Sequence, residues 1–557
     1  MTTMYEEGSP SSPLLVLGEA PAKTEARLGR PFCGQAGDVL NDCLHTAGLA
    51  RSQCYILNAF PFEVHKDRGD NILRDGELLW SVSKGFTEAG MEAAKPTMER
   101  INASKSRAIM PLGRPAFDLV SAGHKPIMKW RGSPLWSERF NRKYIPSVHP
   151  AATIHGVYVW RYLIISDMLK ISKELDSYEL KLPQRNFIIR PTYADVYHFL
   201  NACREAKCFA TDLEVMNFQV YCFSMSYKPD EALVIPFRDD RGTEYWDEDD
   251  EIRIWKMYAE LMSDPEIMKV NQNIVGFDAP FLLQQNNIHT CGPLGDTMIA
   301  QHIIYPEFPK GLDFIASMHT REPYWKDEGK IWKKLDWDWD TFLKYCGKDG
   351  AVALEAWSEL SGDLTAGGYW PTYDMTVEMS DILTAMTVRG LEVDKGKLEA
   401  TDKQLEIDIA AKQEELHQIV GFELNVASSK QCQAYFYDQL GLGPYKNATG
   451  GITTDDKAMS RIVRQAGIGG KAAKCVQDVR RLRKLKSTYM EVELDSDDRL
   501  RCSWNPRGTW TGRLSSSQTV FGTGMNLQNL DPEFKGFIVA DGHRYQATSA
   551  DQESGPN

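Results

Sequence analysis

Three acidic segments in the middle of this 557-residue chain constrain its fold most. Their side chains lie far apart in the sequence, but their residue types are those of a single site, so the fold would have to bring them together. Asp212-Leu-Glu214 follows an apolar run that starts at Cys208 and predicts a strand. Residues i and i+2 of a strand point to one face, so we expect both carboxylates together at the strand end. Asp278 follows, and then Tyr345 and Asp349, one helical turn apart.

These residue types fit a site for hard divalent cations. Asp212, Glu214, Asp278 and Asp349 would hold two Mg²⁺ (or Mn²⁺) ions that clamp a scissile phosphate. One ion would lower the pKa of an attacking water and the other would stabilise the leaving oxygen, while Tyr345 orients the water. An isolated pair of acids is usually only surface charge. All three segments in this order, separated by 66 and 71 residues, are hard to obtain by chance.

The acidic set resembles the three motifs of DnaQ-like 3′–5′ proofreading exonuclease domains. The surrounding segments FATDLEV, VNQNIVGFD and LKYCGKDGAVALE resemble those of family A DNA polymerases. The resemblance implies an RNase H-like exonuclease domain over residues 180–368. It also implies metal ligation by Asp212, Glu214, Asp278 and Asp349, and a strand end held by Asn273.

Residues 371–557 resemble the thumb and the first part of the palm of family A polymerases almost continuously. The matching segments are MTVRGLEVD (386–394), FELNVASSKQCQAYFYDQLGL (422–442), ITTDDKAM (452–459), RRLRKLKSTYM (480–490), TGRLSSS (511–517) and NLQNL (526–530). Long helices are expected at 395–419 and 472–490.

The second of these helices is strongly basic, and the resemblance implies that it contacts a primer–template duplex. Its cationic residues would neutralise DNA phosphates and make the affinity salt-dependent; they are Arg480, Arg481, Arg483, Lys484 and Lys486. Arg513 would reach the minor groove, where the acceptors are shared by all correct base pairs, with Gln528 and Asn529 nearby. Without these neighbours, a charge run is more often a solvated face.

The last residues resemble the palm strand that ends in the first metal-binding carboxylate, here Asp551. The register of Glu553 relative to that motif stays open. The fingers helix and the second palm carboxylate do not follow, so we expect that this chain alone does not polymerise. A second polymerase chain carrying fingers and the rest of the palm is one explanation. An interrupted gene and an expressed fragment are the others.

Residues 1–175 alternate short apolar runs with helical segments, which predicts α/β layers. The segments LLVLGEAPAKTEARLGRPFCGQAGDVLNDCL (14–44), YILN (55–58), PLGRPAF (111–117) and IPSVHPAAT (145–153) resemble the uracil-DNA glycosylase superfamily, closest to its family 4-like branch. Such enzymes flip the base into a pocket.

By that resemblance Phe32 would stack on uracil and Asn58 would read its Watson–Crick edge. Glu19 would polarise water or steady the oxocarbenium, and His149 would stabilise the departing anion. Ala22 departs from the usual glycine, the segment AFPFEVHKDRGDN after Asn58 departs from the usual basic run, and four iron–sulfur cysteines are missing. A degenerate domain kept for DNA binding or assembly is therefore the alternative.

Composition adds few restrictions. The net charge of −13 argues mildly against a nucleic-acid partner. The 11 scattered cysteines contain no CxxC pair, which disfavours a zinc ribbon or disulfides and favours a reducing cytoplasm, that of the host if the source is viral. No run approaches the roughly 18 apolar residues of a membrane span. An acidic stretch at 239–251 predicts a solvated loop.

We therefore expect an α/β multidomain chain: a glycosylase-like α/β domain (1–175), an RNase H-like exonuclease domain (180–368), and a mostly helical thumb with an incomplete palm (371–557). The predicted function is 3′–5′ exonuclease within a family A polymerase, with DNA as partner and bacteriophage as source. Alternatives are a stand-alone repair exonuclease that uses the polymerase remnant as a clamp, and a non-catalytic replication scaffold. Uracil excision and oligomeric state stay open.

Overall fold

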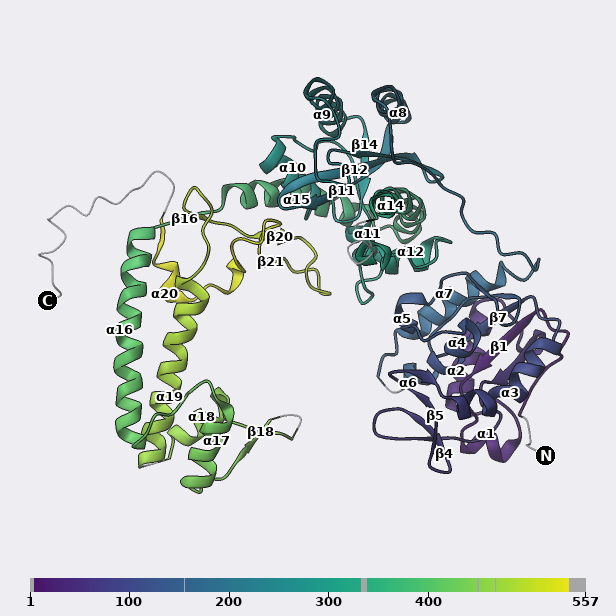
Figure 1. Ribbon diagram of the computed structural model, residues 1–557, viewed down its shortest axis with the longest axis horizontal. Coiled ribbons are helices and arrows are strands. Elements are labelled where there is room, and N and C mark those ends of the chain that lie inside the picture. Colours follow the sequence, from purple (N-terminus) through teal and green to yellow (C-terminus); the bar gives the residue numbers. More distant parts are fainter. Residues whose placement is uncertain (1–4, 155, 332–337, 448–449, 466, 540–557) are drawn as a thin grey trace, which may run out of the picture. The chain divides into compact units, whose positions relative to one another are not determined.

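The computed structural model describes residues 5–154, 156–331, 338–447, 450–465 and 467–539 (Figure 1). Asp551 and Glu553 lie outside the described residues. The chain divides into two compact units, Met1–Glu378 and Met379–Asn557. The first unit contains two main sheets, each with its own buried core. The predicted boundary near residues 175–180 stays a prediction, since residues 1–378 form one compact unit.

The first sheet has five strands in the order β2-β1-β7-β9-β8, and only β8 runs antiparallel to its neighbour. Its strands are β1 (Leu14–Gly18), β2 (Cys54–Asn58), β7 (Ala108–Pro111), β8 (Leu135–Ser137) and β9 (Arg142–Tyr144). Leu14 and Val16 pack into one core cluster, whereas Leu15 and Leu17 pack into another on the opposite face. A sheet buried on both faces explains why its central strands are apolar runs without polar alternation.

Helices cover this sheet, and the two apolar clusters lie between helices and strands. They are α1 (Lys23–Leu28), α2 (Gln35–Thr46), α3 (Glu88–Ala103), α4 (Arg114–Ser121), α5 (Ile127–Trp130), α6 (Ala151–Ile154) and α7 (Trp160–Ser172). The α/β layers and the apolar strands predicted from sequence are confirmed.

The segment after Asn58 forms a small antiparallel sheet that sequence analysis did not predict. Its strands are β3 (His65–Lys66), β4 (Ile72–Arg74), β5 (Glu77–Ser81) and β6 (Gly85–Phe86). Asp75 and Gly76 both have positive φ, as a two-residue Asp-Gly hairpin turn requires. Phe60 and Trp80 belong to the separate apolar cluster beneath this sheet. The insert therefore has a core of its own.

The second sheet is mixed and has the order β10-β13-β12-β11-β14-β15. Its strands are β10 (Asn186–Ile188), β11 (Cys208–Met216), β12 (Gln219–Lys228), β13 (Glu231–Pro236), β14 (Met268–Asn271) and β15 (Leu294–Asp296). β11, β12 and β13 pair antiparallel, whereas β14 and β15 run parallel to β11. Crossover helices connect the parallel strands, as parallel pairing requires.

Helices cover both faces of this sheet, with α14 on one side and α8 and α9 on the other (Figure 1). They are α8 (Tyr193–Ala206), α9 (Glu248–Ser263), α10 (Asp278–Asn286), α11 (Thr297–Ile304), α12 (Leu312–His319), α13 (Glu328–Ile331) and α14 (Trp339–Gly367). The acidic stretch predicted as a loop is partly helical. Asp247 caps α9 by accepting the Asp250 N–H at 2.9 Å, and the acids that follow suit the positive end of the helix.

Buried charges connect α7 and the residue that ends α5 to α12 in the first unit. Arg131 and Asp167 form a fully buried ion pair, and Arg131 also donates to Ser317 Oγ at 2.8 Å. Lys170 donates to the carbonyl oxygen of Thr320 at 2.6 Å. A buried charge is tolerated only when it is paired and hydrogen-bonded, so these contacts fix the loop after α12 against α7.

The second unit is built on two long helices, α16 (Lys395–Val420) and α19 (Ile468–Leu485), which pack side by side (Figure 1). A π-helical turn, η3 (Lys486–Met490), extends α19. The long helices predicted from sequence are confirmed. The other elements are α15 (Trp370–Arg389), which crosses the unit boundary, β16 (Leu391–Val393), α17 (Ser429–Gln433), η2 (Ala434–Gln439), β17 (Tyr445–Lys446), β18 (Ile452–Thr453), α18 (Asp456–Val463), β19 (Arg499–Leu500), β20 (Ser503–Asn505), β21 (Ser515–Ser517), η4 (Leu527–Asn529), α20 (Pro532–Lys535) and β22 (Ile538–Val539).

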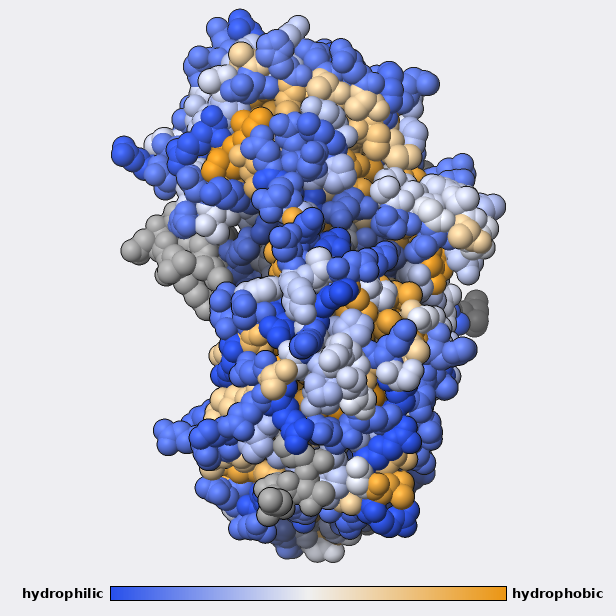
Figure 2. Space-filling model, turned by 90° about the vertical axis from the view of Figure 1, so that its right-hand side faces the viewer, coloured by the Kyte–Doolittle hydropathy of each residue, from blue (hydrophilic) through white to orange (hydrophobic). Residues whose placement is uncertain are grey.

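The molecular face in Figure 2 is largely hydrophilic, with apolar residues in small separate groups. Within the described ranges, no helix combines the length and apolar character needed to cross a membrane.

Candidate active sites and nucleic-acid interface

The predicted acidic residues lie around one side of the second sheet, with Asp212 and Glu214 on β11, Asp278 at the start of α10 and Asp349 on α14. Asp212 and Glu214 point to the same face of β11, as predicted, but they lie within the strand and not at its end. The strand continues to Met216 because a register shift between Glu214 and Val215 keeps it paired with β12. Such bulges re-aim side chains next to functional sites. Ligand atoms of Asp212, Glu214 and Cys346 lie within 4.8 Å of one another.

Helix α14 supplies the other side of the cluster, with Tyr345, Cys346 and Asp349. Two glycines allow the helix to approach the sheet closely. A Cβ on Gly350 would lie 2.6 Å from Ser224 Oγ, and one on Gly347 would lie 2.9 Å from Val234. This close packing places the charged side chains of helix and strand in one site.

Asp278 enters the cluster at the start of α10 and is 2% exposed. The turn before it begins at Asn273, whose φ is +64° and whose carbonyl accepts the Gly276 and Phe277 N–H groups. Asp296 steadies this turn by accepting the Val275 N–H at 3.3 Å. Asn273 thus lies just beyond β14, where a role in holding the strand end was predicted. Within the described part of the chain, Asp278 Oδ1 has no hydrogen-bond partner.

Electrostatics in the cluster are dominated by burial. Burial, reinforced by the charge of Asp349, raises the pKa of Asp212 to about 8. Burial and the charge of Asp212 raise the pKa of Asp278 well above its usual range. The pKa of Tyr345 is raised by burial and then by Asp349, Glu214 and Asp212, so this phenol keeps its proton. Carboxylate oxygens gathered in this way, with Asp278 Oδ1 lacking a partner among the described residues, fit a divalent cation.

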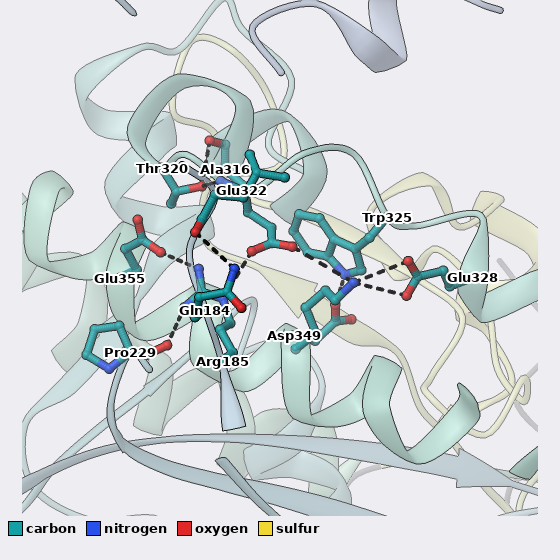
Figure 3. Close-up of polar contacts among 12 residues, drawn as sticks. Gln184, Arg185, Pro229, Ala316, Thr320, Glu322, Trp325, Glu328, Asp349 and Glu355 are labelled. Atoms are coloured by element: carbon teal, nitrogen blue, oxygen red, sulfur yellow. Dashed lines mark hydrogen bonds and ion pairs between the residues drawn. The ribbon is translucent and has the colours of Figure 1, made fainter. Parts of the chain in front are cut away.

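Two neighbours of Asp349 were not identified from the sequence. The Trp325 indole N–H donates to Asp349 Oδ1 at 2.6 Å, a contact visible in Figure 3. Lys326 forms an ion pair with Asp349 Oδ2 and lies 3.1 Å from Tyr345 Oη. Both precede the Tyr345-x-x-x-Asp349 motif by about twenty positions, and no sequence period links them to it. Cys346 could have been noticed, since it adjoins Tyr345.

A second site lies at the carboxyl ends of β1 and β2, where open α/β sheets commonly bind ligands. Gly18, Phe32 and Asn58 meet there. A Cβ on Gly18 would lie 2.3 Å from Asn58 Oδ1 and 2.6 Å from Phe32 Cε2, so only glycine fits. Phe32 has φ +48°, which is strained for a bulky residue, and its ring stacks on His149 at a centroid distance of 5.6 Å.

The surroundings of His149 and Asn58 determine which hydrogen bonds each side chain can make. The Ala151 N–H donates to His149 Nδ1 at 3.2 Å, which leaves Nε2 to carry the proton of the neutral ring. Burial lowers the pKa of His149, and the charge of Glu19 opposes this shift. Asn58 is 4% exposed, and its Nδ2 lacks a hydrogen-bond partner among the described residues.

Glu19 is less available than predicted, because Lys66 of the insert forms an ion pair with it at 2.7 Å. Glu25 was missed by sequence analysis. Its carboxylate accepts the Phe32 N–H at 2.7 Å and the Ala22 N–H, which fixes the strained loop. Its place as the third residue of a helix is the signal that could have identified it.

The basic helix of the second unit presents only part of its charge to solvent. The Arg480 guanidinium donates to the carbonyls of Val426 and Thr454 at 2.8 and 2.5 Å, and Lys486 pairs with Asp402 at 2.7 Å. These two differ from the free phosphate contacts predicted, because helix packing engages them inside the protein. Their binding to DNA stays a prediction that requires these bonds to break.

The other predicted DNA contacts are exposed. They are Arg481, Arg483, Lys484, Arg513, Gln528 and Asn529. The two predicted loop segments lie together, since Gln528 Nε2 donates to the Leu514 carbonyl at 3.1 Å. The Tyr489 hydroxyl donates to the Asn529 carbonyl at 3.0 Å, which joins this loop to the end of the basic helix.

Comparisons with known proteins assign two parts of the chain. Residues 5–157 match the family model for the uracil DNA glycosylase superfamily, and residues 395–551 match that for DNA polymerase family A. A solved structure, the POL domain of Pol1 from M. smegmatis in complex with DNA primer-template and dNTP, is 19% identical. It covers 64% of this chain and 59% of its own, with a TM-score of 0.48.

Curated relatives are bacterial proteins described as DNA polymerase I. That of Rhizobium leguminosarum is 29% identical over 48% of this chain and 27% of the relative. That of Pseudomonas aeruginosa is 27% identical over 68% of this chain and 42% of the relative, so the chain spans less than half the length of each relative. A bacteriophage source stays a prediction. Both resemblances are confirmed at the level of the domain: the chain contains a uracil DNA glycosylase-like region and a DNA polymerase family A-like domain.

Proposed function

We propose that this protein acts in DNA replication or repair as a metal-dependent 3′–5′ exonuclease attached to a family A polymerase domain. Two observations carry the proposal. Ligand atoms of Asp212 and Glu214 lie together with Cys346 within 4.8 Å, and the charges of Asp349 and Asp278 are close enough to shift the titration of this group. Asp278 Oδ1 also lacks a partner among the described residues. The mixed sheet with α14 packed across it is compatible with an RNase H-like domain.

Mg²⁺ or Mn²⁺ would be held by these four carboxylates, with two ions as the expected number. When bound, such ions supply an activated water and neutralise charge on the scissile phosphate. The chain itself positions the reactants. Tyr345 stays protonated, so its hydroxyl can hydrogen-bond the attacking water. The bulge in β11 and the tight contact of α14 fix the geometry in advance, which lowers the entropic part of the barrier.

A second activity, release of uracil, is favoured by the pocket in the first sheet. Asn58 Nδ2, which has no partner among the described residues, can donate to uracil O4 while Asn58 Oδ1 accepts N3–H. The Phe32 ring provides a stacking face, and His149 Nε2–H can donate to O2 as the base leaves with the bonding electrons. The Lys66–Glu19 pair makes Glu19 a weaker candidate for activating water than the sequence predicted.

The second unit would bind the primer–template duplex through Arg481, Arg483, Lys484 and Arg513. Nucleotidyl transfer, and a second chain that completes the palm, stay predictions because the chain spans only part of its relatives. The non-catalytic scaffold differs from this proposal in having no nuclease activity, so the nuclease experiment below separates the two. The stand-alone repair nuclease would have the same exonuclease activity but no second chain that completes the palm.

Replacing both β11 carboxylates should abolish the nuclease. We expect Asp212→Ala with Glu214→Ala to reduce Mg²⁺-dependent degradation of single-stranded DNA to background, because the metal loses ligands from one whole side. Glu248→Ala with Asp249→Ala removes the same charge from an exposed helix start and should leave the rate unchanged. A double β11 variant that degrades DNA at the normal rate would rule out the assignment.

The metal-free protein should lose stability as pH rises. The pKa of Asp212 is about 8 in the folded protein, against a usual 3.8. The contribution of this carboxyl to the free energy of unfolding is therefore complete below pH 3.8 and is lost as the pH rises through 8. With a chelator present, we expect the melting temperature of the wild-type protein to fall by several degrees between about pH 5 and pH 9, relative to that of Asp212→Asn over the same range.

Adding Mg²⁺ at pH 8 should restore the wild-type melting temperature and leave that of Asp212→Asn nearly unchanged. A wild-type protein whose melting temperature follows that of the variant at every pH would contradict the crowding of carboxylates described above.

Uracil release tests the pocket. We expect the wild-type protein to release uracil from single- or double-stranded oligonucleotides, and Asn58→Ala or His149→Ala to slow release about 10²-fold, the usual cost of removing one stabilising donor. Asn41→Ala and His45→Ala, on the exposed side of α2, serve as matched controls. Absence of release by the wild-type protein on every substrate would favour a domain kept for binding or assembly.

A further inference from the structure

The segment 324–328, which leads from α12 into the start of α13, touches the carboxylate cluster with some residues and the glycosylase-like region with others. Trp325 is 2% exposed and packs in an apolar cluster with Leu312 and Val352 of the flanking helices. Its indole N–H donates a hydrogen bond to Asp349 Oδ1. The Lys326 ammonium forms an ion pair with Asp349 Oδ2 and lies 5.0 Å from the centroid of the Tyr345 ring.

The other residues of this segment anchor it to the glycosylase-like region and to α14. The Tyr324 N–H donates to Ser133 Oγ at 3.2 Å, and the Tyr324 ring lies 5.3 Å from that of Trp130. Asp327 accepts from Lys129 at 3.0 Å. Glu328 pairs with Lys348 of α14 at 3.2 Å. Lys326 is therefore held in the cluster by a segment fixed on both sides, and not by a freely rotating surface loop.

Lys326 faces more than one acid. Besides Asp349, the charges of Asp212 and Glu214 act on its ammonium. The cluster thus already contains one positive charge supplied by the chain. Because like charges repel strongly in a buried site, an ammonium and a divalent ion cannot share Asp349 without a large cost.

We propose that Lys326 is a built-in counter-ion of the carboxylate cluster, which competes with a divalent ion for Asp349. This rests on the proposed function, since it takes the cluster as a divalent-ion site. An ion bound mainly by Asp212 and Glu214 can enter while Lys326 stays in place. An ion that needs Asp349 binds only when Lys326 leaves, so the two positions differ in affinity.

The experiment measures Mn²⁺ binding to the full chain from the electron paramagnetic resonance signal of free Mn²⁺, independently of nuclease activity. Lys326→Met should tighten binding at the weaker position by at least about tenfold, because the competing charge is gone. Lys326→Arg keeps the charge and should resemble the wild type. Lys330→Met removes an exposed lysine nearby and should change nothing.

A double-mutant cycle confines the effect to Asp349. In the Asp349→Asn background, adding Lys326→Met should leave Mn²⁺ affinity unchanged, since the carboxylate for which both cations compete is absent. If Lys326→Met is destabilised by its uncompensated Asp349, the same competition appears as a larger gain in melting temperature on adding Mn²⁺ than the wild type shows.

Equal or weaker Mn²⁺ binding by Lys326→Met, with normal binding by the wild type, overturns this proposal and leaves the proposed nuclease standing. Loss of nuclease activity with unchanged Mn²⁺ binding also overturns it, because Lys326 would then act on the DNA phosphate. Absence of Mn²⁺ binding by wild type and variants alike overturns the metal site, and with it both proposals.

Discussion

The ion pair between Lys326 and Asp349 stabilises a buried group of acids that would otherwise repel one another. Several features of the first unit serve that crowded site. β11 shifts register at Glu214, α14 approaches the sheet over Gly347 and Gly350, and the turn at Asn273 delivers Asp278 to the cluster. Each would be an expensive arrangement for a purely structural core, because buried like charges oppose folding.

The pocket in the first sheet is organised by shape more than by charge. Gly18 leaves room for Phe32 and Asn58, and Glu25 holds the strained Phe32 loop through backbone hydrogen bonds. Its histidine is kept neutral by burial, in contrast to the charged groups of the carboxylate cluster. The buried Arg131–Asp167 pair and its bond to Ser317 connect the two regions within one compact unit.

Local sequence patterns correctly predicted the structural features that depend on residues close together in the chain. The apolar runs became β1, β2 and β7, Asp212 and Glu214 share one face, and Tyr345 and Asp349 lie one turn apart on α14. The predicted end of this strand at Glu214 was wrong, because the continuation of β11 to Met216 depends on pairing with β12. Arg480 was predicted to face DNA, although it follows the buried Ala473 and Val476 at spacings of seven and four residues and so shares their face. Lys326 and the insert sheet after Asn58 depend on long-range contacts that leave no periodic pattern in sequence.

The central claim is that the cluster binds divalent ions and that Lys326 yields to them. Anomalous diffraction from crystals of the full chain grown with and without Mn²⁺ tests it most directly. The account predicts a manganese peak bounded by Asp212 and Glu214, with Lys326 displaced from Asp349 when a second peak forms beside that carboxylate. Crystals in saturating Mn²⁺ that show no peak among these carboxylates, or a peak touching Asp349 with Lys326 still bound to it, would contradict the account.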